Sequence, residues 1–404
     1  MLAVRRITRL ALAVTCLVLA AAAPAATARP TGLAARLTTA LAVPQAGLTA
    51  ALAVDLQTGE ILFRRRARLG LVPASNEKLA VTYTALVVLG PAYRIETTVF
   101  GDGELIDGVW RGNLVLKGYG DPTLTTGDLR RLAAQLRAGG VTRVTGGILG
   151  DESYFDARRV GPLWKPGYYL NESPPLSALT VNRSSYAGYV SSEPALGAAQ
   201  AFRDALLGAG ISVGGSVSRG RVSADAFPLA SVSSPPIAAL VRWMNRDSDN
   251  FIAELLLKQL GVVNRSQGTT ARGAAMVRTT LDAAGVPLDG VRIVDGSGLS
   301  PYDRLTADAL VGILEAAWTD PEVRRPFTAS LPVAGVTGTL ADRLRAPPAR
   351  GNVMAKTGTT LAASTLAGYV RKRFAFAVLN NGRPVSPYWA RRAQDRFVAV
   401  LAAK

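Results

Sequence analysis

The chain has 404 residues, is 49% hydrophobic and carries a formal charge of +17. This length and composition are typical of a globular protein with more than one domain. The sequence contains no histidine, and its only cysteine is Cys16. Ser-His-Asp and Cys-His sites are therefore excluded, as are most zinc and haem sites, and we predict no metal and no cofactor.

The first 28 residues have the pattern of an export signal. The apolar run Leu10–Ala26 is followed by Ala26-Thr27-Ala28, a small-residue cleavage site. The positive segment before this run consists of Arg5, Arg6 and Arg9. We therefore predict a signal peptide over 1–28 and a protein that acts in the periplasm or the extracellular cell-wall space. A retained membrane anchor is the alternative, because the run is close to spanning length.

The positive charge bears on the partners of the protein. Loss of the three signal arginines would leave a formal charge of +14. Nucleic acid is one interpretation of such a charge, but an exported protein seldom meets nucleic acid, and no basic stripe is interleaved with aromatic residues. We predict no nucleic-acid partner. Peripheral attraction to an anionic envelope fits the compartment better, although arginine-rich composition without a function is the simplest interpretation.

The predicted elements begin with a β-hairpin over 47–65, in which two apolar runs flank the turn at 57–60. A helix is expected from about Ser75, because an apolar stripe recurs with helical spacing. Residues 93–225 have a different sequence pattern, in which short predicted strands are separated by glycine-rich turns. There we expect strands over 95–100, 113–117 and 144–149, and helices over 129–136 and 199–207.

From residue 237 the pattern is helical again, and Ser248-Asp249-Asn250 interrupts it at a helix–helix corner. Three strands follow over 352–360, 364–370 and 374–379, and a last amphipathic helix covers 388–402. Such a helix can lie on a membrane, but we expect it to pack on the sheet. The predicted fold is α+β. An antiparallel sheet flanked by helices is built from 29–92 plus 226–404, and a smaller αβ domain is inserted over 93–225.

Three short motifs carry the predicted chemistry: Ser75-Asn76-Glu77-Lys78, Ser248-Asp249-Asn250 and Lys356-Thr357-Gly358. Taken singly, each has a purely structural explanation: a helix cap with a surface lysine, an Asx-type cap by Asp249 or Asn250, and a strand that ends in a turn. However, only one of the seven lysines has a serine three positions before it, and Ser-x-Asn and Lys-Thr-Gly each occur once. Together the motifs predict an acyl-transfer site that needs no imidazole.

Each motif has a predicted role. Ser75 is the nucleophile at a helix N-terminus, and Lys78 lies on the same helix face. Burial and a neighbouring cation, Lys356, would lower the pKa of Lys78 to about 7–8, so that it can accept the serine proton. Ser248 would relay a proton between Lys78 and the leaving group, and Asn250 would hold the amide carbonyl of the substrate.

The remaining predicted residues bind the substrate. Lys356 would face the cleft from an edge strand and, with the hydroxyls of Thr357 and Thr359, would attract a substrate carboxylate. Gly358 would let the substrate backbone approach closely. The backbone N–H groups of Ser75 and Thr359 would form the oxyanion hole. Asp249 is counted among the substrate-binding residues.

The motifs resemble those of the low-molecular-mass class C penicillin-binding proteins, the D-alanyl-D-alanine carboxypeptidase/endopeptidase family. Further stretches match this family: Gly120–Leu124, Ser177–Asn182, Asp295–Ser300 and Gly335–Leu340. The resemblance implies a serine β-lactamase/DD-peptidase-like domain with an insertion. It also implies cleavage of D-Ala-D-Ala bonds or cross-links in peptidoglycan stem peptides, and acylation by β-lactam antibiotics.

The sequence departs from the family at two places. A third domain that often follows the stretch matching Ser177–Asn182 is absent or vestigial. In addition, the family tends to have an acidic residue and an arginine that bind the stem-peptide side chain. This chain has Lys165-Pro166 in place of the acidic residue and Pro301 in place of the arginine. Arg304, Tyr168 or Glu172 could substitute for them. A β-lactamase is an alternative, although we find no Glu-x-x-Leu-Asn pattern, and a non-catalytic cell-wall-binding protein is another.

Overall fold

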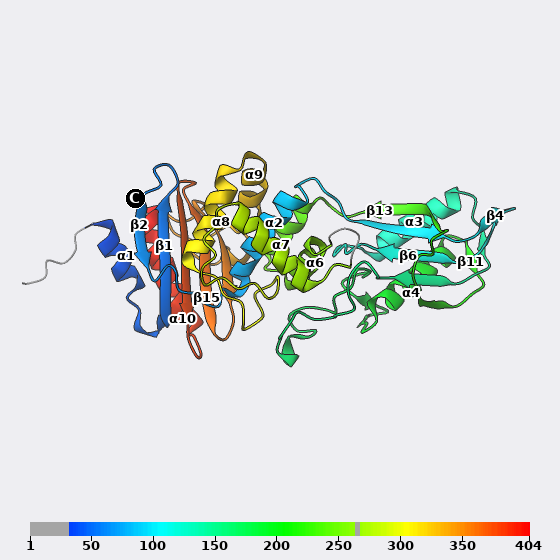
Figure 1. Cartoon of the computed structure of the whole chain (residues 1–404), viewed down its shortest axis with the longest axis horizontal. Helices are drawn as coiled ribbons and strands as arrows, with labels where there is room; N and C mark the ends of the chain where they lie inside the picture. The colour runs from blue at the N-terminus through cyan, green and yellow to red at the C-terminus, as the bar shows by residue number, and fades with distance from the viewer. Residues whose placement is uncertain (1–31, 263–266) are drawn as a thin grey trace, which may run out of the picture.

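The computed structural model describes residues 32–262 and 267–404, so the predicted signal peptide over 1–28 lies outside the described residues. The molecule is elongated (Figure 1). A sheet built from both ends of the chain lies at one end, and the segment between β3 and β13 forms the other. Among the described helices, none has the length and apolar composition needed to cross a bilayer.

The main sheet has five antiparallel strands in the order β14-β15-β16-β1-β2. Helices cover both of its faces, so its strands are continuous apolar runs, and all eight residues of β15 are buried. The predicted hairpin and the three predicted C-terminal strands are confirmed. Their bounds are Leu48–Asp55 (β1), Ile61–Arg65 (β2), Val353–Thr359 (β14), Ala363–Val370 (β15) and Phe374–Asn381 (β16).

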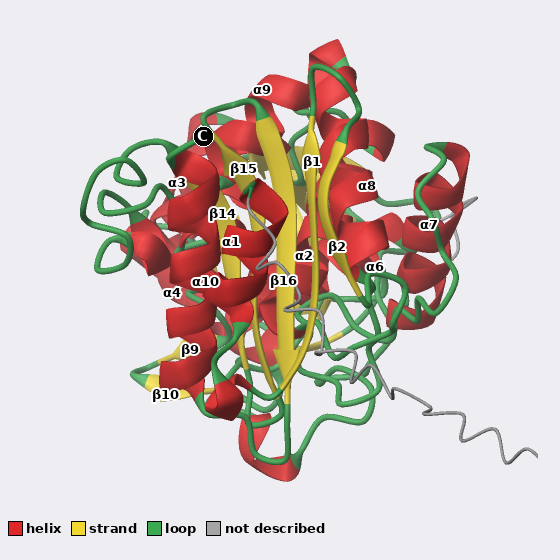
Figure 2. Cartoon of the chain, turned by 90° about the vertical axis from the view of Figure 1, so that its left-hand side faces the viewer, coloured by secondary structure: helices red, strands yellow, loops and turns green. Residues whose placement is uncertain are grey.

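Two helices, α1 (Leu33–Leu41) and α10 (Pro387–Ala402), cover one face of this sheet (Figure 2). Phe397 of α10 packs edge-on against Phe63 of β2, with ring centroids 5.4 Å apart. The last helix therefore packs on the sheet, as expected. The helices on the other side are α2 (Glu77–Val88), α5 (Ile237–Arg246), α6 (Asn250–Leu260), α7 (Thr270–Ala283), α8 (Ala307–Thr319) and α9 (Pro321–Ser330).

The inserted segment has a sheet and a core of its own. Its five-stranded sheet has the order β12-β8-β6-β3-β13, in which β6, β8 and β12 are parallel. Helices α3 (Thr126–Ala138) and α4 (Pro194–Gly208) pack on this sheet. The strands are Glu96–Gly101 (β3), Leu114–Gly118 (β6), Ile148–Asp151 (β8), Val217–Arg219 (β12) and Phe227–Ser233 (β13).

A smaller sheet in the same segment corrects one prediction. Residues 144–149 do not form one strand. They contribute to β7 and β8, which belong to different sheets. The chain changes sheet at Gly146 and Gly147, where a Cβ would lie only 2.3 Å from the Gly112 carbonyl oxygen and 2.5 Å from that of Ser216. The smaller sheet consists of Glu104–Ile106 (β4), Val109–Arg111 (β5), Arg143–Val144 (β7) and Ser212–Val213 (β11).

A small apolar cluster joins the inserted segment to the rest of the chain. Phe155, Leu176 and Ala178 pack against Phe251 and Leu255 of α6. Helix α6 begins at the Ser-Asp-Asn turn, so this contact places the inserted segment directly beside the predicted site. The division into domains at residues 93 and 226 stays a prediction.

Candidate active site

Ser75 lies in a tight 3-10 turn over Ala74–Asn76, and α2 begins at Glu77, two residues after the predicted helix start. Ala74 has φ of +48°, a conformation that costs energy for a residue with a Cβ. Lys78 follows one helical turn after the serine, and its Nζ lies 3.0 Å from Ser75 Oγ. The strained turn and the start of α2 thus hold the hydroxyl against the amine.

The Lys78 amine is fully buried and has fixed partners. Its Nζ donates to Asn250 Oδ1 at 2.8 Å and to the Ser297 carbonyl at 2.7 Å. Burial lowers the pKa of Lys78 to about 8, although nearby carboxylates, first Asp295 and then Glu254, act in the opposite direction. About a tenth of this amine is therefore uncharged at pH 7, and about half at pH 8.

The Ser-Asp-Asn motif forms the corner between α5 and α6, as predicted. Ser248 has φ of +59°, and Asp249 caps α6 by accepting from the Ile252 N–H at 2.9 Å. Asp249 also forms an ion pair with Arg183 of the inserted segment, at 2.7 Å. These contacts make Asp249 a structural residue of the turn, and its part in substrate binding stays a prediction.

Lys356 lies on the edge strand β14 and is fully buried. Its Nζ donates to Ser248 Oγ at 2.9 Å and to the Thr357 carbonyl at 2.8 Å. Burial lowers the pKa of Lys356 well below its ordinary value, and the charge of Lys78 lowers it further. Ser248 therefore contacts the second lysine, whereas Asn250 contacts the first.

Gly358 has a packing role in the structure, and its predicted role beside the substrate backbone stays a prediction. A Cβ at this position would lie 2.3 Å from Thr365 Oγ1 and 2.9 Å from the backbone nitrogen of Ser75. The missing side chain thus lets β14 pack directly against the nucleophile's own turn, rather than making room for a substrate alone. This packing brings the backbone of the Lys-Thr-Gly strand beside Ser75.

These segments enclose a cleft of about 460 Å³. Ser75, Ser248, Asn250, Thr357 and Thr359 all line it, so the structure brings predicted residues from three distant motifs to one place. Glu172 of the inserted segment, which the sequence offered as a reader of the stem-peptide side chain, also lines the cleft. The other lining residues were not predicted from the sequence: Leu299, Thr339, Asp342, Arg343 and Arg391.

Sequence reasoning missed a group of buried carboxylates behind Lys78: Glu77, Glu254, Asp295 and Asp303. Burial, followed by the charge of Asp295, raises the pKa of Glu254 to about 8 and holds the pKa of Glu77 and Asp303 well above the ordinary carboxyl values. Glu77 and Asp295 lie in stretches that the motifs include, but no local pattern marks the group, because its members come from α2, from α6 and from the loop between α7 and α8.

The carboxylates hold the loop that contacts Lys78. Glu254 Oε1 accepts from the N–H groups of Gly296 and Ser297, at 3.0 and 2.8 Å. Asp295 accepts from the Ser300 N–H and from Trp164 Nε1, both at 2.7 Å. Since the Ser297 carbonyl accepts from Lys78 Nζ, the geometry of this loop fixes the position of the amine.

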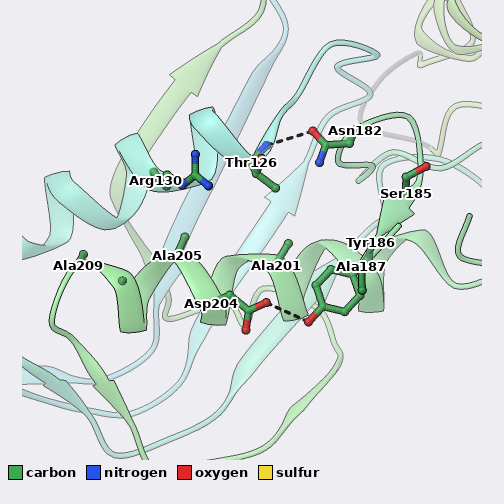
Figure 3. A pocket seen from close by; sticks show the side chains of 11 residues that line it. Thr126, Arg130, Asn182, Ser185, Tyr186, Ala187, Ala201, Asp204, Ala205 and Ala209 are labelled. Carbon is green, nitrogen blue, oxygen red and sulfur yellow. Dashed lines mark hydrogen bonds between the residues drawn. The ribbon is translucent and has the colours of Figure 1, made fainter. Parts of the chain in front are cut away.

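A second cavity, of about 530 Å³, lies in the inserted segment between α3 and α4 (Figure 3). Tyr186 donates to Asp204 there at 2.9 Å, and the Thr126 N–H donates to Asn182 at 3.2 Å. Its lining residues include none from the three sequence motifs. The cleft at Ser75 is therefore the candidate active site.

The chain is similar to known proteins along most of its length. A model of the D-Ala-D-Ala carboxypeptidase 3 (S13) family matches residues 33–192 and 185–404. A D-alanyl-D-alanine carboxypeptidase of Actinomadura sp. (strain R39) is 32% identical over 419 residues, which cover 81% of this chain and 77% of that protein. Carboxypeptidase DacB of Mycolicibacterium smegmatis is 32% identical over 94% of this chain and 85% of its own length.

The fold has a solved counterpart. The crystal structure of penicillin binding protein 4 (dacB) from Haemophilus influenzae superposes with a TM-score of 0.80 at 22% identity, over 89% of this chain and 97% of that one. The predicted α+β fold of the β-lactamase/DD-peptidase type is thus confirmed.

The chain belongs to the D-Ala-D-Ala carboxypeptidase 3 (S13) family. It is a serine-type D-Ala-D-Ala carboxypeptidase, a hydrolase, as the sequence predicted.

Proposed function

We propose that Ser75 carries the acyl-enzyme of the carboxypeptidase reaction and that Lys78 is its general base. One observation supports this assignment above all: Lys78 Nζ lies 3.0 Å from Ser75 Oγ, in a buried position that lowers its pKa to about 8. An uncharged amine at hydrogen-bond distance is the arrangement that general-base catalysis requires.

The reaction then has two steps. Ser75 Oγ attacks the carbonyl carbon of the penultimate D-Ala, its proton passes to Lys78, and the peptide C–N bond breaks as the leaving nitrogen gains a proton. The terminal D-Ala departs. Water then attacks the ester on Ser75, the stem peptide leaves with a carboxylate, and Ser75 recovers its proton.

The other predicted residues assist these steps. Ser248, held by Lys356, would pass the proton to the leaving nitrogen. The backbone N–H groups of Ser75 and Thr359 would stabilise the oxyanion, each contributing about 10²–10³ in rate. The hydroxyl of Thr357 donates to Thr339 Oγ1 at 2.8 Å, so the Thr339 hydroxyl keeps its own proton to donate to a substrate carboxylate.

The substrates proposed are stem peptides of peptidoglycan, with D-amino-acid cross-links as a second class. Glu172 lines the cleft and contacts Asn250, whereas neither Arg304 nor Tyr168 is among the lining residues. We therefore assign the reading of a stem-peptide side chain to Glu172. We also propose that β-lactams acylate Ser75 and that residues 1–28 direct export. The basic protein would in addition be attracted to an anionic envelope.

Release of D-Ala from a stem peptide ending in D-Ala-D-Ala tests the function. Wild-type protein should release one D-Ala per peptide, and Ser75→Ala and Lys78→Ala should both lose this activity while they keep the fold. D-Ala release by the folded Ser75→Ala variant would overturn the proposal. Rapid and complete turnover of penicillin by the wild type, without D-Ala release, would instead support a β-lactamase.

A further inference from the structure

A groove of about 660 Å³ adjoins the active-site cleft. One wall is the segment 344–349, with Pro347 and Pro348, and the other is the exposed face of α10, with Tyr388 and Ala399. Arg391 lines both the cleft and the groove, and the chain passes directly from Arg343 in the cleft to Leu344 in the groove. The groove therefore extends the cleft past Arg391.

The groove is strongly basic. Four arginines line it: Arg345, Arg391, Arg392 and Arg396. All four are exposed, and none forms an ion pair with any residue that the structure describes. The acidic residue in the lining, Asp395, is engaged by Arg343 at 2.6 Å. The groove thus presents unneutralised guanidinium groups, which pair with carboxylates in a fixed planar geometry.

The charges of the cleft indicate which part of a substrate reaches this groove. Glu172 contacts Asn250 on the wall formed by the Ser-Asp-Asn turn. Arg391 lies beside Thr359, with 3.5 Å between Nη2 and Oγ1, on the wall formed by β14. A negatively charged leaving residue is repelled from Glu172 and attracted to Arg391. Asp342 also lines the cleft, but the guanidinium that the cleft shares with the groove is Arg391. These charges favour a substrate whose leaving side points towards the groove.

We propose that this groove binds the leaving peptide of a cross-linked substrate through its carboxylates. This inference rests on the proposed function. In the carboxypeptidase reaction the leaving group is a single amino acid, and its carboxylate reaches no further than Arg391. In cross-link cleavage the leaving amine belongs to a second stem peptide, which carries further carboxylates and needs a longer, basic site. The groove supplies that site.

The test compares two substrates and two variants. The substrates are a cross-linked peptide dimer with free carboxylates on its leaving peptide, and the same dimer with those carboxylates amidated. The variant Arg345→Gln/Arg392→Gln/Arg396→Gln removes three groove charges and leaves Arg391 in place. The control Arg111→Gln/Arg137→Gln/Arg325→Gln removes three exposed arginines that lie outside the groove and form no ion pair with described residues.

The groove variant should lose about tenfold in kcat/KM on the free-carboxylate dimer, since exposed charge pairs each contribute modestly. The groove variant should stay within about twofold of wild type in two other activities, D-Ala release from a single stem peptide and cleavage of the amidated dimer. The control variant should stay within about twofold of wild type in every activity. An unchanged rate on the free dimer, or an equal loss on the amidated dimer or in the control variant, would overturn the inference.

The result also separates the two proposals. Wild-type protein that releases D-Ala but does not cleave the free dimer would overturn the groove assignment alone. Wild-type protein that cleaves neither substrate would overturn the proposed function.

Discussion

Asn250 donates its side-chain amide to Glu172 through two acceptors, the backbone carbonyl at 3.0 Å and the carboxylate at 3.3 Å. The two residues come from different parts of the fold, because Asn250 begins α6 and Glu172 belongs to the inserted segment. The inserted segment is thus a wall of the active site, and it brings a carboxylate to the residue that also contacts Lys78.

Glu172 should therefore discriminate between stem peptides by charge. Glu172→Gln is expected to lower kcat/KM about threefold to fivefold for a peptide whose side chain ends in a free amine, because a partly exposed ion pair contributes at most about 1 kcal/mol. The same peptide with its amine acetylated serves as the control and should be unaffected. Equal effects on both peptides would show that Glu172 only supports Asn250.

The pH dependence of D-Ala release should report the titration of Lys78. The uncharged amine is the active form, so kcat/KM should rise with pH through about 8 and level off above it. An ordinary lysine would place this rise above about pH 10. A value of kcat/KM that stays constant between about pH 6 and 9 would contradict the role of Lys78 as the base.

Replacement of Lys78 by arginine keeps a cation but removes the base, because a guanidinium does not lose its proton at these pH values. Lys78→Arg should therefore reduce the rate of D-Ala release by at least about 10²-fold. The matched control is Lys372→Arg, at an exposed position in the turn between β15 and β16, which should leave the rate unchanged.

The buried carboxylates should make stability depend on pH. Because the pKa of Glu254 is raised to about 8, the folded protein binds more protons than the unfolded chain between the ordinary carboxyl pKa and that value. This contribution to stability is present at low pH and is lost as pH rises through about 8. Glu254→Gln lacks the titration, so wild type should lose stability relative to this variant between about pH 5 and 9.

Glu254→Ala should be far more harmful than Glu254→Gln at pH 6. Glutamine keeps an oxygen for the Gly296 and Ser297 N–H groups, whereas alanine leaves both without their acceptor and opens a cavity. We expect a loss of about 2–4 kcal/mol for the alanine variant in urea unfolding. Equal stability of the two variants would contradict the proposed support of the Lys78 loop.

The cap of α6 offers a test of the Ser-Asp-Asn turn. Asp249→Asn keeps an acceptor for the Ile252 N–H, but Asp249→Ala removes it and should cost about 1 kcal/mol. The partly exposed ion pair with Arg183 should contribute less than about 1 kcal/mol, measured with Arg183→Met. If Asp249→Asn were as unstable as Asp249→Ala, the ion pair rather than the cap would hold the turn.

The sequence predicted the features that depend on local pattern. The hairpin of β1 and β2, the three C-terminal strands and the helix corner at Ser248 each follow from apolar periodicity and turn residues within a short window. The three motifs were recognisable because each one is short, contiguous and rare in the chain. Their meeting in one cleft was an inference from chemistry, and the structure places them there.

The missed features depend on residues that are distant in the sequence. Arg391 reaches the cleft from the last helix, and its neighbours give no local sign of this position. The buried carboxylates Glu77 and Glu254 resemble ordinary surface acids in the sequence, although both are fully buried. The strand expected over 144–149 failed for a similar reason, because the close packing of Gly146 against a distant segment divides it.

The most direct test of the central claim is mass spectrometry of the protein after brief exposure to penicillin, with the modified peptide mapped. We predict one penicilloyl adduct on Ser75, no adduct in the folded Ser75→Ala variant, and slow labelling of Lys78→Arg. An adduct on another residue, or full labelling of Ser75→Ala, would contradict it.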